Sequence, residues 1–69
     1  MAGKTYKVIE LVGVSEESVE RAIESAIARA DQTLQHLDWF EVVESRGAIK
    51  DGKVSEYQVK LKLGFRVET

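Results

Sequence analysis

The stretch YQVKLKLGFRV, residues 57–67, alternates apolar and polar side chains without interruption. Apolar side chains stand at every second position, with glutamine, lysine, glycine or arginine between them. Because successive side chains of a β-strand point to opposite faces, this pattern predicts a strand with one apolar and one polar face. We expect the strand to begin near Val54, after the turn signal Asp51-Gly52.

Three further elements are predicted before this strand. Thr5 to Val12 is short and rich in β-branched residues, which is typical of a strand. Apolar side chains then recur at three- and four-residue steps from Val19 to Leu37 and predict a long amphipathic helix. Ser15 is expected to cap the start of this helix, with His36 in its last turn. A second strand is predicted from Trp39 to roughly Gly47.

The order strand, helix, strand, strand predicts an α+β fold with a three-stranded antiparallel sheet (β-α-β-β) and one long helix. The last two strands form a hairpin, and the third strand is expected between the other two. The alanines of the helix allow its backbone to lie close to one face of the sheet. The other face then has no layer in this chain to cover it. We interpret residues 1–69 as a single domain.

Composition restricts the function. A chain of 69 residues without cysteine is only marginally stable alone, so oligomerisation is an attractive source of additional burial. The net charge of −2 with mixed signs lacks the basic stripe typical of nucleic-acid binding. No apolar run reaches the roughly 20 residues that span a membrane, and no signal peptide is evident. The expected location is the cytoplasm.

Trp39 is the most informative single residue. It is followed directly by Phe40, so the two side chains must point to opposite faces of the strand. Phe40 and Val42 are expected under the helix, which leaves the only tryptophan on the outer side. Leaving a large aromatic side chain in water forgoes roughly 1.5–3 kcal/mol of burial. We therefore expect another subunit or a flat ligand to cover it.

Gln58 belongs to the same outward set as Trp39. An indole stacks on flat rings, and an amide offers a donor beside an acceptor, so the pair suits a planar heterocycle such as a flavin pyrimidine or a nucleobase. Arg46 and Arg66 could meet an attached phosphate. Strict alternation places Arg46 on the helix side, and it reaches the outer site only if a bulge breaks the register. Contact with a neighbouring subunit is an alternative for Trp39, and solvation is an alternative for Gln58. For the two arginines the alternative is solvation or pairing with a glutamate.

Catalytic chemistry finds little support in the sequence. His36 is the only histidine, and no serine or cysteine nucleophile stands at a recognisable spacing from it. One histidine with scattered carboxylates does not make a metal cluster, and no Gly-rich nucleotide-binding loop is present. We predict no catalytic residue and no metal site.

Six segments of the chain form a recognisable pattern: VGVSEES (12–18), ARA (28–30), LDWFEV (37–42), RG (46–47), YQV (57–59) and GFR (64–66). Together they resemble the dodecins, a family of small flavin-binding proteins. In this family a three-stranded antiparallel sheet partly wraps one helix, and the chains assemble as hollow dodecamers. The resemblance covers essentially the whole chain.

The resemblance implies specific roles. Trp39 would stack on the flavin ring, with two flavins and two symmetry-related tryptophans forming an aromatic tetrad, and Gln58 would bond the ring edge. Arg46 would assist at the phosphate or in closing the site, and Arg66 would contact coenzyme A, which some members bind. The implied function is storage of FMN, or of riboflavin or FAD, and quenching of its photochemistry in a homododecamer, without catalysis.

Two alternatives stay open at this stage. In the first, the chain is a pure assembly module in which Trp39 is an interface anchor, and the particle binds coenzyme A or no flavin. In the second, it is a small enzyme that uses bound flavin.

Overall fold

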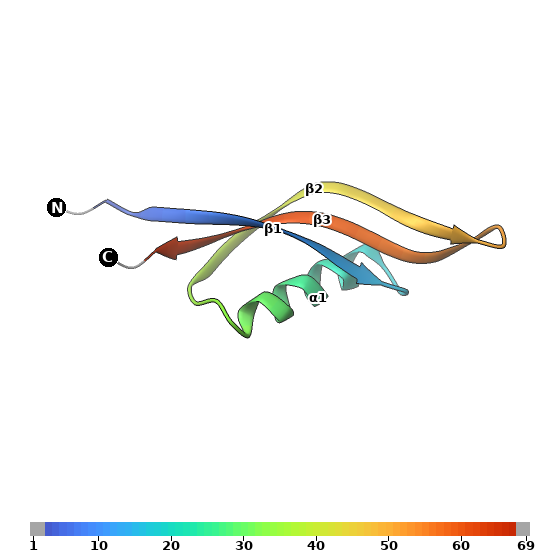
Figure 1. Ribbon diagram of the computed structural model, residues 1–69, viewed down its shortest axis with the longest axis horizontal. Helices are drawn as coiled ribbons and strands as arrows, with labels where there is room; N and C mark the ends of the chain where they lie inside the picture. Colours follow the sequence, from blue (N-terminus) through green and yellow to red (C-terminus); the bar gives the residue numbers. More distant parts are fainter. Residues whose placement is uncertain (1–2, 68–69) are drawn as a thin grey trace.

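The computed structural model describes residues 3–67 as one helix on one side of a three-stranded sheet (Figure 1). The strand order is β1-β3-β2, and both pairs of neighbours are antiparallel. The predicted α+β class, the order of elements and the central place of the third strand are thus confirmed. The elements are β1 (Thr5–Ser15), α1 (Val19–Asp31), β2 (Leu37–Lys50) and β3 (Lys53–Val67). Among residues 3–67, no helix is both long and apolar enough to cross a membrane.

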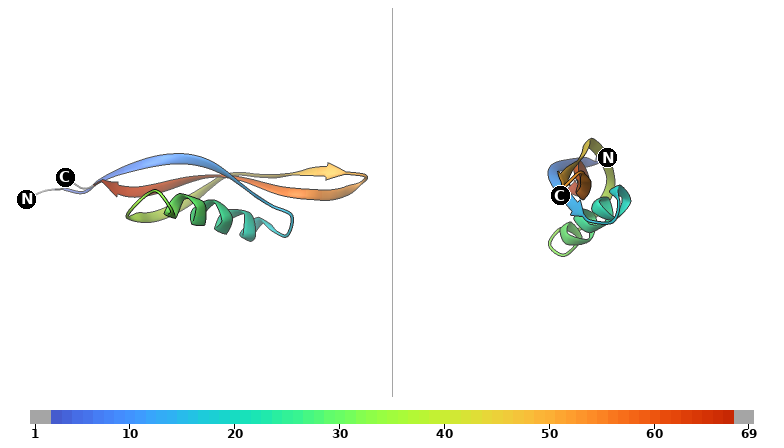
Figure 2. Two further views of the ribbon diagram at one scale, coloured as in Figure 1. Left: turned by 60° about the horizontal axis from the view of Figure 1, so that its bottom comes forward. Right: turned by 90° about the vertical axis from the view of Figure 1, so that its right-hand side faces the viewer.

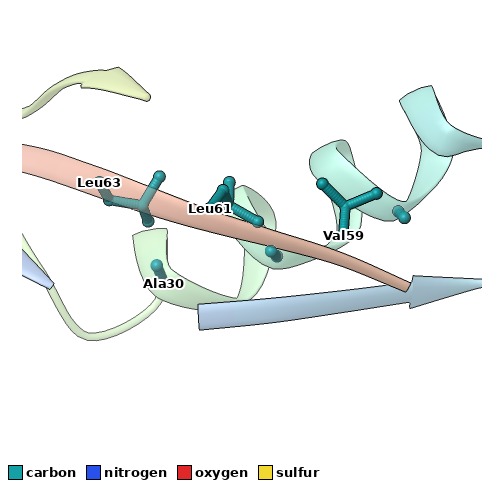
Figure 3. Packing of buried hydrophobic residues seen from close by; sticks show 6 residues of the cluster. Ala30, Val59, Leu61 and Leu63 are labelled. Atoms are coloured by element: carbon teal, nitrogen blue, oxygen red, sulfur yellow. The ribbon is translucent and has the colours of Figure 1, made fainter. Parts of the chain in front are cut away.

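The core lies between α1 and β3, on the side of the sheet that the helix covers (Figures 2 and 3). Three alanines at four-residue spacing face the sheet, as the thin apolar stripe predicts. The helix backbone therefore comes close to β1, where a Cβ atom at Gly13 would overlap the carbonyl oxygen of Ala22. The buried apolar residues are Ala22, Ala26, Ala30, Val59, Leu61 and Leu63.

The start of α1 differs from the prediction. Ser18, with an extended backbone at φ −166°, is the N-cap, and its Oγ accepts a hydrogen bond from the Arg21 amide at 3.0 Å. Ser15 is instead the last residue of β1, where it pairs with Tyr57. Its hydroxyl accepts a bond from the Glu17 amide at 2.9 Å. The prediction of Ser15 as the cap was wrong because its backbone still belongs to the sheet.

The helix also ends earlier than predicted, at Asp31. Leu34 and Leu37 continue the apolar spacing and pack against the core, but they lie beyond the last helical turn. His36 is not in that turn either, because it adopts a positive φ of 63° just before β2 begins. At Leu34 and Leu37, the spacing of apolar residues therefore indicates contact with the core and not a helical backbone.

The β2–β3 hairpin is longer than predicted and extends beyond the start of α1 (Figure 1). β2 runs to Lys50 and β3 starts at Lys53, so the connection is only the two residues Asp51 and Gly52. Their φ angles of 54° and 74° are those of the turn type that matches the twist of paired strands. Of the segment from Ala48 to Lys53, expected between the strands, only the predicted turn Asp51-Gly52 lies outside them.

One helix is too narrow to cover the whole sheet. α1 packs mainly against β1 and β3, and the subunit is elongated, at 58 × 20 × 13 Å. Phe40 and Val42 lie opposite Leu63 and Leu61, on the helix side as predicted. They nevertheless remain 47% and 44% exposed, so the prediction that the helix covers them was wrong.

The contact of α1 with β1 yields a prediction for Gly13→Ala. The added methyl group must push the helix from the sheet, because it meets backbone atoms of Ala22 that cannot rotate away. Overpacking of this kind costs about 1–3 kcal/mol, and rigid backbone favours the upper end. Urea unfolding at fixed protein concentration, followed by circular dichroism, measures the change. Gly3→Ala is the matched control, because a Cβ there meets nothing within 4 Å. Equal midpoints for the two variants would contradict the close approach.

Candidate functional site

The face of the sheet opposite α1, here called the outer face, is uncovered within the subunit (Figure 2). Along β1 it exposes Val8, Val12 and Val14, each about half accessible. Its centre is charged, since the register places Lys62 between Glu10 and Glu41. Opposite charges facing each other across strands are favourable neighbours, so this part of the face is suited to water or to a polar partner.

A first irregularity in β2 lets Leu37 face the core while Trp39 faces the outer side. Leu37 pairs with Phe65 and Trp39 pairs with Gly64, so Asp38 is an extra residue that shifts the register. Leu37 therefore stays in contact with the core, although strict alternation would place it on the same face as Trp39.

A second irregularity turns Arg46 towards the outer face. The register shifts between Val42 and Glu44, where Val43 is the extra residue. Arg46 then lies opposite Gln58, on the outer face. The break of register that the sequence required for Arg46 is therefore present.

Trp39, Tyr6 and Gly64 form what we call the aromatic cluster. The Tyr6 and Trp39 rings meet edge to face, with centroids 5.0 Å apart and planes at 63°. Gly64 is buried beneath the indole, and a Cβ atom there would overlap the indole carbons Cε2, Cζ2 and Cη2. The indole is still 42% exposed. It thus lies over the backbone of β3 and retains open surface on which a flat ligand can stack.

Arg46, Gln58 and Glu56 form what we call the amide cluster. The Arg46 Nε donates to Gln58 Oε1 at 2.8 Å, and Gln58 Nε2 donates to Glu56 Oε2 at 2.7 Å. A guanidinium can only donate and an ionised carboxylate can only accept, so both partners hold the amide in the same orientation. One acceptor lone pair and one N–H of the amide remain for a ligand.

The two clusters lie far apart within one subunit. Gly64 of the aromatic cluster and Gln58 of the amide cluster both belong to β3. They are six residues apart, which is roughly 20 Å along a strand. Arg66 lies opposite Tyr6, at the end of the aromatic cluster. The predicted site residues therefore share the outer face but divide into two groups: Trp39 and Arg66 at one end, and Gln58 and Arg46 at the other.

Sequence reasoning did not assign a role to Tyr6, Gly64 or Glu56. A glycine in the interior of a strand signals close approach of another group, so Gly64 could have been recognised from its place in the alternating pattern. Tyr6 belongs to the outward set of β1, and only the register shows that it reaches Trp39. Glu56 has no signal beyond sharing a strand face with Gln58.

Comparison with known proteins gives a consistent result. The family model described as Dodecin matches residues 5–68. Dodecin of Thermus thermophilus is 62% identical over 66 residues, which is 96% of each chain. The solved dodecin of Streptomyces coelicolor superposes with a TM-score of 0.95 at 54% identity, covering 100% of this chain and 99% of that one. A calcium dodecin of Mycobacterium tuberculosis is 31% identical over 90% of this chain and 87% of its own. Because both its fold and its sequence match, the chain belongs to the dodecin family.

Proposed function

We propose that this protein binds a flavin, FMN or the related riboflavin or FAD, as stacked pairs within a homododecamer. In this function it buffers free flavin and quenches its photochemistry. The observation that carries the proposal is the Trp39 indole, which lies over the backbone of an uncovered sheet face and remains 42% exposed. A flat aromatic surface held in this way suits a flat aromatic ligand.

The amide cluster suits the edge of such a ligand. The pyrimidine ring of a flavin presents carbonyl oxygens beside an N–H, and Gln58 retains one donor and one acceptor. Its orientation is set by Arg46 and Glu56, so the amide need not be ordered when the ligand binds. Arg66, on the outer face, supplies a cation for a phosphate, of FMN or of coenzyme A.

The subunit has the features of a part of a larger assembly. Its Cα radius of gyration is 14.5 Å, whereas a compact domain of this length has about 11 Å. Ile49 and Val54 face each other across the hairpin end with 78% and 57% of their surfaces exposed. A pair of isoleucine and valine left this open favours contact with another copy.

Assembly is also what makes the proposed site complete. A flavin ring stacked on Trp39 cannot reach the Gln58 amide roughly 20 Å away in the same subunit. We therefore propose that the indole and the amide of one site come from different subunits.

Binding, and not turnover, is the activity that these residues support. An electron-rich indole stacked on an excited flavin quenches it by electron transfer. Two ligands stacked in one pocket also leave little room for a substrate. The name of the Mycobacterium relative mentions calcium. In this chain, residues 3–67 bring together no group of three or more His, Asp or Glu side chains suited to a metal ion, so calcium is not part of the proposal.

The first test is Trp39→Ala. Removing the indole deletes the stacking surface, and we expect FMN affinity to fall at least about tenfold, or 1.4 kcal/mol. Titration of the apo-protein, followed by quenching of flavin fluorescence, gives the dissociation constant. Trp39→Phe is the graded control and should retain part of the affinity, because it keeps a flat ring. Unchanged quenching by Trp39→Ala would refute the stacking role, and wild-type protein that neither quenches FMN nor purifies with a yellow ligand would favour a pure assembly module.

The second test is subunit mixing between Trp39→Ala and Gln58→Ala. Each variant alone should bind FMN weakly, because every site lacks one of its two contributions. When the two are unfolded together and refolded as mixed particles, some sites receive an intact indole from one subunit and an intact amide from another. We expect these particles to recover a fraction of wild-type quenching, whereas the two variants refolded separately and then combined should not. Mixed particles that quench no more than the separate ones would show that both contributions come from one subunit.

A further inference from the structure

We infer that Gly64 and Tyr6 are positioning residues that hold the Trp39 indole against the sheet as a preformed stacking platform. The inference rests on the proposed flavin site and concerns how that site is built. Neither residue needs to touch the ligand, since each acts through the indole.

Gly64 sets the height of the platform. It stands opposite Trp39 in the register, at a position where any other residue would project a side chain from the outer face. The indole occupies that space, and three atoms of its benzene ring lie where a Cβ would be. A side chain at position 64 would therefore lift the ring from the strand or force it into another rotamer.

Tyr6 sets the lateral position. Trp39 belongs to β2 and Tyr6 to β1, on the far side of the central strand. The indole thus crosses over β3 and meets the Tyr6 ring edge to face at 5.0 Å. Contacts of this geometry favour one arrangement by roughly 2- to 12-fold in a population ratio. With β3 below it and a ring at its far edge, the indole has few other places to go.

A platform fixed in the absence of ligand contributes to affinity through preorganisation. A side chain that is already in its bound rotamer loses little conformational freedom when a ring stacks on it. The affinity for a flat ligand should therefore depend on residues 6 and 64 even though the ligand contacts residue 39.

The experiment compares Gly64→Ala, Tyr6→Leu and Tyr6→Phe. Trp39 is the only tryptophan, so the emission spectrum and the near-ultraviolet circular dichroism of the apo-protein report on this indole alone. We expect Gly64→Ala to shift the emission to longer wavelength and to weaken riboflavin binding about tenfold or more. Tyr6→Leu should lose roughly 2- to 12-fold in affinity, and Tyr6→Phe should keep wild-type behaviour, because the contact is made by the ring.

A double-mutant cycle separates the platform from general damage. Gly64→Ala should lower the unfolding midpoint in the wild-type background and much less in a Trp39→Leu background, where no indole opposes the added methyl group. This holds even if Gly64→Ala alone does not fold: folding restored by Trp39→Leu supports the inference, and a double variant that also fails to fold overturns it for Gly64.

The remaining outcomes are also decisive. Wild-type emission and riboflavin affinity in both Gly64→Ala and Tyr6→Leu would overturn the inference. Wild-type protein that does not bind riboflavin, combined with shifted apo-protein spectra in these variants, would refute the proposed function and leave the held indole in place.

Discussion

The close packing of α1 on β1 and β3 is the constraint on which the rest of the structure depends. Alanines on the helix and Gly13 on the strand remove the side-chain atoms that would hold the two backbones apart. The result is a small core, in which helix alanines pack on a valine and two leucines of β3 beneath a helix that covers part of one face of the sheet. The outer face and much of β2 therefore retain apolar side chains without cover in the subunit. This uncovered surface is where the candidate site lies.

Two extra residues in β2 then decide which side chains the uncovered surface presents. Under strict alternation, Leu37 and Trp39 would share one face of the sheet and Arg46 would lie on the other. The observed arrangement, with Leu37 in the core and Trp39 and Arg46 on the outer face, therefore requires breaks in the register. The shift at Asp38 lets Leu37 and Trp39 face opposite sides, and the shift at Val43 brings Arg46 to the same face as Trp39. Bulges re-aim side chains in this way at the expense of local pairing, and both of these lie in a strand that contributes to the candidate site.

Much of the fold could be predicted because its signals are local. Alternation from residue 57 to 67 predicts the central strand, and Asp51-Gly52 predicts the hairpin. Counting outward from that turn places Trp39 opposite Gly64, each twelve residues from the nearer turn residue. The count holds because the extra residue Val43 in β2 is offset by an extra residue in β3, at the shift between Ala48 and Ile49. Alternation alone predicts that the indole and the amide share a face, but it does not predict how far apart they lie. Their separation of roughly 20 Å follows only when the residues between them along the strand are also counted. The end of α1, the bulges and the Tyr6 contact depend on long-range packing, which leaves no comparable local pattern.

The separation of the two clusters links ligand binding to assembly. One subunit holds its indole and its amide roughly 20 Å apart, so under the proposed function a complete site exists only where copies meet. A ligand that binds the assembled form and not the separate subunits stabilises the assembly by mass action, and assembly raises ligand affinity by the same free energy. Under the proposed function, a chain with so small a core therefore has two coupled sources of stability, the apolar contacts between copies and the ligand held among them. On this view the exposed indole is no defect of the subunit, because the surface left uncovered by one helix is the surface that both partners require.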